Sequence, residues 1–130
     1  MTALEEARKM FSADHYATSS TGCDIVEVGE KYAKCVLHLD GRHYNAVGQV
    51  MGGVAYTLAD FTFAVATNFP QGKTVTVSAT ISYLSKIKGS VLYGESHLIK
   101  DGRRNCFYEV TVTDDLGNPV AMVNFTGAHV

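Results

Sequence analysis

Three kinds of residue between positions 45 and 60 suit chemistry on a carbonyl group: an amide side chain, a glycine pair and a carboxylate. Asn45 is followed by Gly52 and Gly53 and then by Asp60, in the spacing N-x6-G-G-x6-D. Glycines at a helix start expose backbone N–H groups, and the helix dipole favours an oxygen gaining negative charge there. The pattern therefore predicts an oxyanion site near a carboxylate. Taken alone, the glycine pair is better explained by a turn or by tight packing.

Asp60 is the one charged residue in the otherwise apolar segment 52–68. An unpaired carboxylate buried in a helix costs several kcal/mol unless neighbours compensate or its pKa rises. A buried aspartate satisfied by hydroxyl groups is the plainer alternative. The presence of Asn45 and the glycine pair nearby in the sequence favours the active-site interpretation instead.

A central helix and an antiparallel sheet must position these residues. Residues 52–68 are rich in Ala and Leu and are closed by Phe69-Pro70, which predicts a helix. Because this helix has almost no polar face, we expect a sheet to wrap around it and bury most of it. A capping box at Thr2-Ala3-Leu4-Glu5 predicts a short amphipathic helix over 2–13.

Strand signals lie on both sides of the central helix. In the strand that begins at Val75 and ends at Tyr83, apolar residues alternate with hydroxylated ones, which predicts one apolar and one hydroxylated face. The other expected strands are 24–28, 32–39, about 90–100, 104–113 and 119–128. The fold class is therefore α+β, with residues 1–130 forming one domain.

The spacing within the motif is too long for one self-contained site. Gly52 and Asp60 are separated by eight positions, which is roughly 12 Å along a helix. If a second copy of the helix ran antiparallel beside the first, Asp60 of one subunit would approach Gly52 of the other, twice by symmetry. We therefore predict a homodimer with two shared sites. The sequence leaves open whether dimers pair into tetramers.

Composition excludes several other classes of protein. A formal charge of −2 and the absence of a Lys/Arg run argue against a nucleic-acid surface. No segment approaches the roughly 20 apolar residues that a membrane span needs. The three cysteines are scattered without metal-site or redox spacing, which suggests a reducing compartment. We expect a cytoplasmic protein with no metal, no cofactor, no membrane and no nucleic-acid partner.

The chain resembles the PaaI-like acyl-CoA thioesterases of the hot-dog fold. The match covers nearly its full length and includes GCDIVEVGEKYAKCVLHL, RHYNAVGQVMGGVAYTLAD and TVTVSATISYLSK. The resemblance implies a curved antiparallel sheet wrapped around a long central helix. It also implies hydrolysis of an acyl-CoA whose acyl group is small or medium in size, aromatic groups included.

The resemblance also implies roles for individual residues. Asp60 would be the nucleophile or general base, and the Gly52 N–H would polarise the thioester carbonyl. Asn45 would orient the thioester or the water. The hydroxyl that relatives place near the carboxylate matches Thr76, although a plain polar strand residue explains Thr76 equally well.

One position departs from the resemblance. The family commonly has His before the glycine pair, whereas this chain has Met51, which can neither donate that hydrogen bond nor titrate. Met51 and Gly53 are expected to contact substrate, and filling an apolar gap is the plainer role for Met51. The nearby His43 is not shown by sequence to reach the site.

Four basic residues are candidate contacts for the phosphates of coenzyme A: Lys86, Lys88, Arg103 and Arg104. Solvated loop charge is their plainer explanation. Two alternatives to hydrolysis remain. One is a non-catalytic acyl-CoA binder, which Met51 would suit. The other is a hot-dog hydratase or dehydratase, which would need a histidine paired with an acid.

Overall fold

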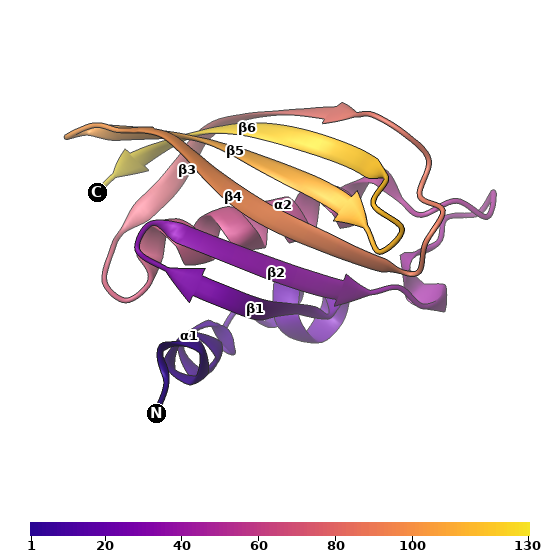
Figure 1. The fold of residues 1–130 in the computed structure, drawn as a ribbon, viewed down its shortest axis with the longest axis horizontal. Helices are drawn as coiled ribbons and strands as arrows, with labels where there is room; N and C mark the ends of the chain where they lie inside the picture. The colour runs from indigo at the N-terminus through magenta and orange to yellow at the C-terminus, as the bar shows by residue number, and fades with distance from the viewer.

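One antiparallel sheet curls around one long helix in the computed structural model, which describes residues 1–130 (Figure 1). The elements, in order, are α1 (Ala3–Phe11), the π-helical η1 (Tyr16–Thr21), β1 (Cys23–Gly29), β2 (Tyr32–His38), the 3-10 turn η2 (Gly41–His43), α2 (Gly52–Asn68), β3 (Thr74–Tyr83), β4 (Val91–Asp101), β5 (Asn105–Asp114) and β6 (Pro119–His129). The predicted architecture, a sheet around a central helix with a short N-terminal helix, is confirmed.

The six strands follow the order β1-β2-β4-β5-β6-β3, and every neighbouring pair is antiparallel. The strand directly after α2 therefore lies at one edge of the sheet, and β1 lies at the other. An edge strand leaves a row of backbone N–H and C=O groups unpaired. In a single chain, β3 keeps one such row open.

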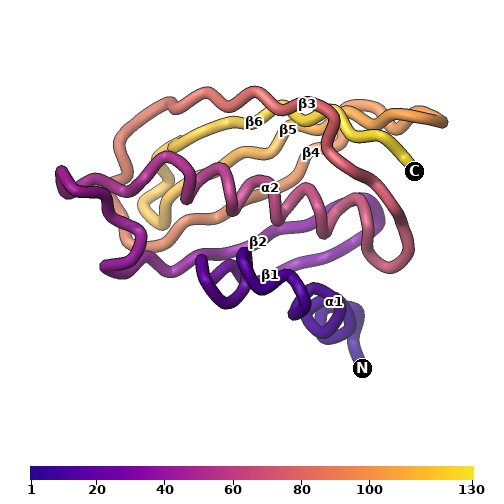
Figure 2. The backbone as a smooth tube through the Cα atoms, turned by 180° about the vertical axis from the view of Figure 1, so that it is seen from behind, coloured from indigo at the N-terminus to yellow at the C-terminus, as the bar shows by residue number.

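Helix α2 lies against the concave face of the sheet (Figure 2) and supplies the centre of the core. It begins and ends at the predicted residues. Phe63 of α2 stacks on Phe125 of β6 at 4.6 Å between ring centroids and meets Tyr108 of β5 edge-on. At the end of the helix, the Asn68 side chain donates a 3.0 Å hydrogen bond to the Ala64 carbonyl. The aromatic contacts fix α2 on the sheet.

Helix α1 has the predicted capping box. The Thr2 hydroxyl accepts from the Glu5 N–H at 3.1 Å, and the Glu5 carboxylate accepts from the Thr2 N–H at 3.2 Å. The helix is shorter than expected and ends at Phe11. Phe11 packs edge-on against Phe61 of α2, with ring centroids 6.0 Å apart. The N-terminal segment is thereby held beside the central helix.

The expected two-faced pattern of β3 is only partly correct. Ala79 and Ile81 pack against the core, but Val75 and Val77 are 50% and 61% exposed. The reason is twofold: the pairing with β6 shifts register between Thr76 and Ser78, and no element of the chain covers this part of the edge strand. The first half of β3 thus exposes two valine side chains to solvent in a single chain.

The other strands begin and end within two residues of their expected bounds. The π-helical η1 was not expected, because its sequence carries no strong helix signal. No helix combines the length and the apolar character required to cross a bilayer.

Candidate active site

The side of α2 that faces away from the sheet carries one open stripe, which includes Gly53, Thr57 and Asp60. These residues recur at helical spacing and line a groove of about 650 Å³. The opposite wall of the groove is formed by residues 14–17, which precede and begin η1. In a single chain Asp60 is therefore exposed, and the expectation of a buried carboxylate is wrong, because nothing of this chain covers the stripe.

The electrostatics of this groove favour the protonated form of Asp60. Partial burial beside the apolar helix raises the pKa of Asp60, and the negative charge of Asp14 across the groove raises it further. A carboxylate with a raised pKa is a better proton acceptor than an ordinary aspartate once it is ionised. Asp60 is thus suited to the role of base or nucleophile.

The other candidate group is the N-terminus of α2. The N-cap residue Met51 has no side-chain capping bond, and neither the Gly52 N–H nor the Gly53 N–H donates a hydrogen bond within the chain. Two unpaired N–H groups at the positive end of a 17-residue helix favour an oxygen with negative charge. The predicted oxyanion site is therefore free to accept a ligand.

Tyr83, at the end of β3, holds this helix N-terminus in place. Its hydroxyl donates a 2.8 Å hydrogen bond to the Gly52 carbonyl. A Cβ at position 52 would lie only 2.9 Å from the Tyr83 hydroxyl oxygen. Close approach of Tyr83 thus requires glycine here. The two residues line a small cavity of about 230 Å³ that also includes Lys86.

Asn45 organises the loop that leads to the glycine pair. Its side-chain oxygen accepts hydrogen bonds from the N–H groups of Val47 and Gln49, each at 3.0 Å. A β-bridge between Tyr44 and Val50 closes the same loop. The side-chain oxygen of Asn45 is therefore committed to the loop, and only its Nδ2 group remains free to contact a ligand.

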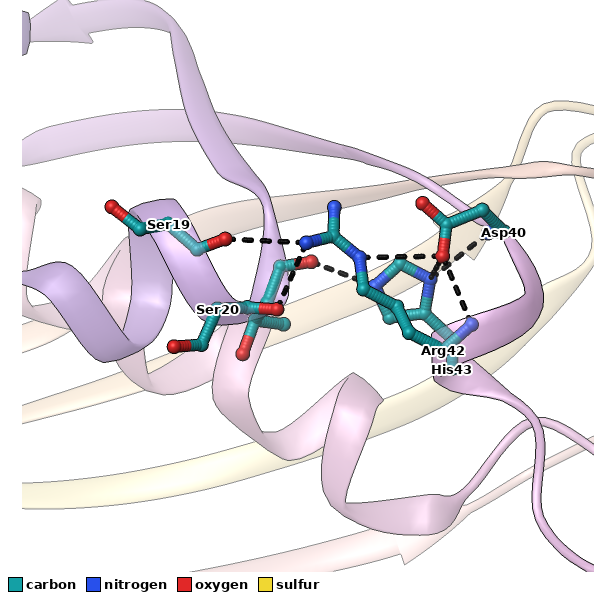
Figure 3. A network of polar contacts seen from close by, with 6 residues as sticks. Ser19, Ser20, Asp40, Arg42 and His43 are labelled. Carbon is teal, nitrogen blue, oxygen red and sulfur yellow. Dashed lines mark hydrogen bonds and ion pairs between the residues drawn. The ribbon is translucent and has the colours of Figure 1, made fainter.

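A polar network anchors this loop to η1, which adjoins the groove (Figure 3). Arg42 donates to the carbonyls of Ser19 at 3.2 Å and Ser20 at 3.0 Å. The buried His43 ring contacts the Thr21 carbonyl through Nε2 at 2.7 Å. Its Nδ1 accepts from the Asp40 N–H at 3.0 Å, so Nε2 carries the proton. His43 is thus a structural tie between η1 and the loop.

Several predicted site residues are separated in one chain. Gly52 lies in the cavity beside Tyr83, whereas Asp60 lies in the groove beside Asp14. The exposed Thr76 lines none of the cavities. Met51 is 59% exposed and borders the cavity of Gly52, so it fills no apolar gap. A single chain contains the parts of a site without assembling them.

The four basic residues do not form one cluster in a single chain. Lys86 and Lys88 precede β4, and Arg103 and Arg104 follow it. Because β4 has 11 residues, these pairs lie roughly 30 Å apart at about 3.3 Å per residue. Figure 1 shows the two ends of β4 at opposite ends of the sheet. Only Lys86 lies beside a candidate site residue.

The groove and cavity residues that the sequence reasoning missed include Asp14, His15 and Tyr83. The first two are far from Asp60 in sequence, and their exposed, polar surroundings resemble an ordinary loop. No local sequence pattern predicts a contact that depends on how α1 and η1 pack. No group of three or more His, Cys, Asp or Glu side chains is placed to hold a metal ion.

Comparison with known proteins identifies the family of this chain. The model of the thioesterase superfamily matches residues 47–121, which include the glycine pair and Asp60. A protein of Archaeoglobus fulgidus that is provisionally named an esterase is 27% identical over 103 residues, or 78% of this chain and 67% of that protein.

Solved structures share the fold over most of the chain. The Escherichia coli PaaI protein from the phenylacetic acid degradation operon superposes with a TM-score of 0.86 at 20% identity, covering 99% of this chain and 96% of that one. A Streptococcus mutans protein solved with acetyl-CoA bound has a TM-score of 0.77 at 26% identity, covering 83% of this chain and 88% of that one. The hot-dog fold is thereby confirmed.

Proposed function

Since the chain belongs to the thioesterase superfamily and is a thioester hydrolase, we propose that it hydrolyses an acyl-CoA with a small or medium acyl group, aromatic groups included. The observation that carries this proposal is that the family's matched segment contains both a glycine N–H without a partner at a helix N-terminus and a carboxylate of raised pKa. The acetyl-CoA bound to the Streptococcus mutans protein supports coenzyme A as the carrier.

In this proposal the Gly52 N–H donates a hydrogen bond to the thioester oxygen as that oxygen gains negative charge. Asp60 either attacks the thioester carbon or takes the proton of an attacking water, and both routes release coenzyme A as the thiol. Asn45 donates to the thioester or to the water through Nδ2, the one part of its side chain that the loop does not use. Thr76 supplies a hydroxyl near the carboxylate.

Two subunits are needed to assemble this site. The groups of one chain are too far apart. Gly52 begins α2 and Asp60 lies in the middle of the same helix, eight residues later, about 12 Å along the axis. The open stripe on α2 and the bare Val75 and Val77 on the edge strand support a two-fold dimer. In it, Asp60 of each subunit faces Gly52 of the other, and dimers can pair further into tetramers.

The phosphates of coenzyme A would then lie along the outer end of the shared site. Lys86 is the strongest candidate contact because it borders the cavity that contains Gly52. Lys88 follows it closely in sequence. Arg103 and Arg104 can take part only from the other subunit, because they lie at the far end of β4. A cytoplasmic location is part of the proposal, since all three cysteines are buried and free.

Hydration or dehydration of an acyl-CoA is the second candidate. The motif itself offers no placed histidine, but the structure puts His15 in the groove that contains Asp60. A histidine and an acid in one groove are the pair that proton transfer at carbon requires. The matched family favours hydrolysis, and the products distinguish the reactions: hydrolysis releases a thiol and hydration does not.

A thiol-release assay over a panel of acyl-CoAs tests the proposal. The panel should include short, medium, aromatic and hydroxylated acyl groups, with Asp60→Asn as the test variant and the exposed Asp115→Asn as the matched control. We expect thiol release from at least one substrate, loss of most of it in Asp60→Asn, and little change in Asp115→Asn. Binding without thiol release by the folded protein would select the non-catalytic binder and overturn hydrolysis.

A further inference from the structure

The largest cavity of the chain lies at the opposite end of α2 from Gly52. It has a volume of about 670 Å³ and shares no lining residue with the groove that contains Asp60. Ala66, Phe69 and Tyr108 contribute to its apolar wall. The cavity is large enough for a small organic molecule, and the proposed thioesterase site makes no use of it.

A chain of polar side chains forms another wall of this cavity. Thr74 Oγ1 lies 2.9 Å from Nδ1 of His129. Nε2 of the same ring lies 2.7 Å from a carboxylate oxygen of Asp101. The second carboxylate oxygen pairs with the Lys31 ammonium at 3.0 Å. All four residues line the cavity.

The positions of the protons follow from these contacts. The hydrogen bond from Lys31 and then that from His129 lower the pKa of Asp101, so its carboxylate is ionised at neutral pH. An ionised carboxylate only accepts, so His129 must donate from Nε2. In the neutral ring Nδ1 then accepts, and the Thr74 hydroxyl donates to it. This is the order of groups that activates a hydroxyl nucleophile: hydroxyl, imidazole, carboxylate.

The backbone holds this chain of groups rigidly. Thr74 and His129 are directly opposite each other in the pairing of β3 with β6. The Thr74 N–H donates a 2.8 Å hydrogen bond to the side-chain oxygen of Asn68 at the end of α2. Thr74 is only 9% exposed and lines the cavity, so it is largely shielded from bulk water. A preorganised nucleophile and base lose little entropy on reaching the reactive geometry.

Donors for a developing oxyanion lie in the adjoining loop. The N–H groups of Gln71, Gly72 and Lys73 make no hydrogen bond within the chain, and all three residues line the cavity. The Lys73 ammonium takes part in no ion pair. An apolar chamber with a polarised hydroxyl and unpaired N–H groups fits a small ester or a similar acyl compound.

We propose that this cavity is a second reactive centre, in which Thr74 is acylated by small carboxylic esters and then hydrolysed. Thr74 Oγ1 attacks the ester carbonyl carbon while its proton passes to Nδ1 of His129. The bond from the carbonyl carbon to the leaving oxygen breaks, and His129 returns the proton to the leaving alcohol. Water then attacks the acyl-threonine with His129 as base, which releases the carboxylic acid and restores the Thr74 hydroxyl.

The test uses p-nitrophenyl butyrate with the Asp60→Asn protein, so that the first site does not contribute. Nitrophenol release is followed by absorbance, and the butyryl adduct is located by mass spectrometry of peptides. We expect the adduct on the Thr74 peptide. Thr74→Val should remove that adduct and lower the rate roughly tenfold or more. Thr74→Ser should keep both, and His129→Phe should lower both.

The control is Thr80→Val, which changes an exposed residue of the same strand in the same way. It should leave the adduct and the rate unchanged. A thermal melt is recorded for each variant. If folded Thr74→Val releases nitrophenol at the parent rate, or if no adduct forms on Thr74, the polar chain only ties the ends of the strands together and the proposal is wrong. Because Asp60 is absent throughout, this failure would leave the proposed thioesterase untouched.

Discussion

The Tyr83 hydroxyl donates a 2.8 Å hydrogen bond to the carbonyl oxygen of Gly52, across 31 positions of sequence. The same peptide group carries the Gly53 N–H, which has no partner within the chain. A hydrogen bond to a peptide carbonyl polarises the group and strengthens its N–H as a donor. Tyr83 therefore orients the helix N-terminus whose Gly52 N–H we propose as the oxyanion donor, and it strengthens the adjoining Gly53 N–H.

Replacing Tyr83 tests this positioning. We expect Tyr83→Phe to lower kcat about fivefold, since a hydrogen bond is worth about 1 kcal/mol, and to leave KM nearly unchanged. Tyr93→Phe is the matched control, because the Tyr93 hydroxyl makes no hydrogen bond within the chain. Steady-state thiol release gives both constants. A rise in KM at constant kcat would show that Tyr83 contacts substrate instead.

Gly52→Ala tests the requirement for close approach. The added Cβ would meet the Tyr83 hydroxyl at 2.9 Å and its ring at 3.1 Å. Tyr83 or the helix start must therefore shift, and we expect kcat to fall about tenfold or more. Gly41→Ala serves as the control, since a Cβ there meets nothing within 4 Å. Full activity in Gly52→Ala would place the oxyanion donor elsewhere.

The pH dependence of kcat/KM should depend on the charge of Asp14. Partial desolvation beside the apolar helix raises the pKa of Asp60, and the Asp14 charge adds to the rise. Catalysis needs the ionised Asp60, so activity falls as the pH drops through this raised pKa. Removing the Asp14 charge lowers the pKa, and Asp14→Asn should move the acid limb of kcat/KM to lower pH. Glu6→Gln, which removes an equal charge from the exposed face of α1, should leave the limb in place. If the acid limb of kcat/KM lies at the same pH in Asp14→Asn, the Asp14 charge does not raise the pKa of Asp60.

The elements of this fold were predictable from local pattern, and the site was only partly so. The bounds of α2 follow from the glycine pair at its start and Phe69-Pro70 at its end, both of which are signals within the segment itself. Asp60 and Gly52 were singled out because a lone carboxylate in an apolar helix and a glycine pair at the helix start are both visible within the segment. The basic residues were grouped by sequence proximity alone, and β4 separates them.

The remaining groups depend on contacts between distant segments. Asp14 meets the groove of Asp60 only because α1 and η1 pack beside α2. The ends of three strands bring together Thr74, Asp101 and His129. No local sequence pattern predicts this contact. The exposure of Asp60 escaped prediction because an apolar helix sequence does not reveal which stripe the sheet leaves uncovered.

Stability at low pH should depend on Asp114, a buried carboxylate that ties the β3–β4 loop to the β5–β6 turn. Five N–H groups donate to it, from the backbones of Lys88, Gly89, Leu116 and Asn118 and from the Asn118 side chain. Burial acts to raise the pKa of Asp114, but these hydrogen bonds outweigh it and hold the pKa well below the ordinary value.

Because this pKa is depressed by folding, the stabilisation is fully present above the unfolded pKa of about 4 and is lost as the pH falls through the folded value. Asp114→Asn should lower the free energy of unfolding by about 2 kcal/mol at pH 7 and flatten its acid dependence. The exposed neighbour variant Asp115→Asn should cost less than half as much. Urea denaturation from pH 3 to pH 7 measures both. An unchanged acid dependence in Asp114→Asn would refute this role.

The shared site is tested most directly by mixing two impaired variants, Gly52→Ala and Asp60→Asn, under conditions that exchange subunits. Each heterodimer would contain one site with Gly52 from one subunit and Asp60 from the other, both intact. Random pairing makes half of the dimers heterodimers, so thiol release should recover to about a quarter of the wild-type rate. No recovery, with heterodimers demonstrated by native mass spectrometry, would contradict a site built from two subunits.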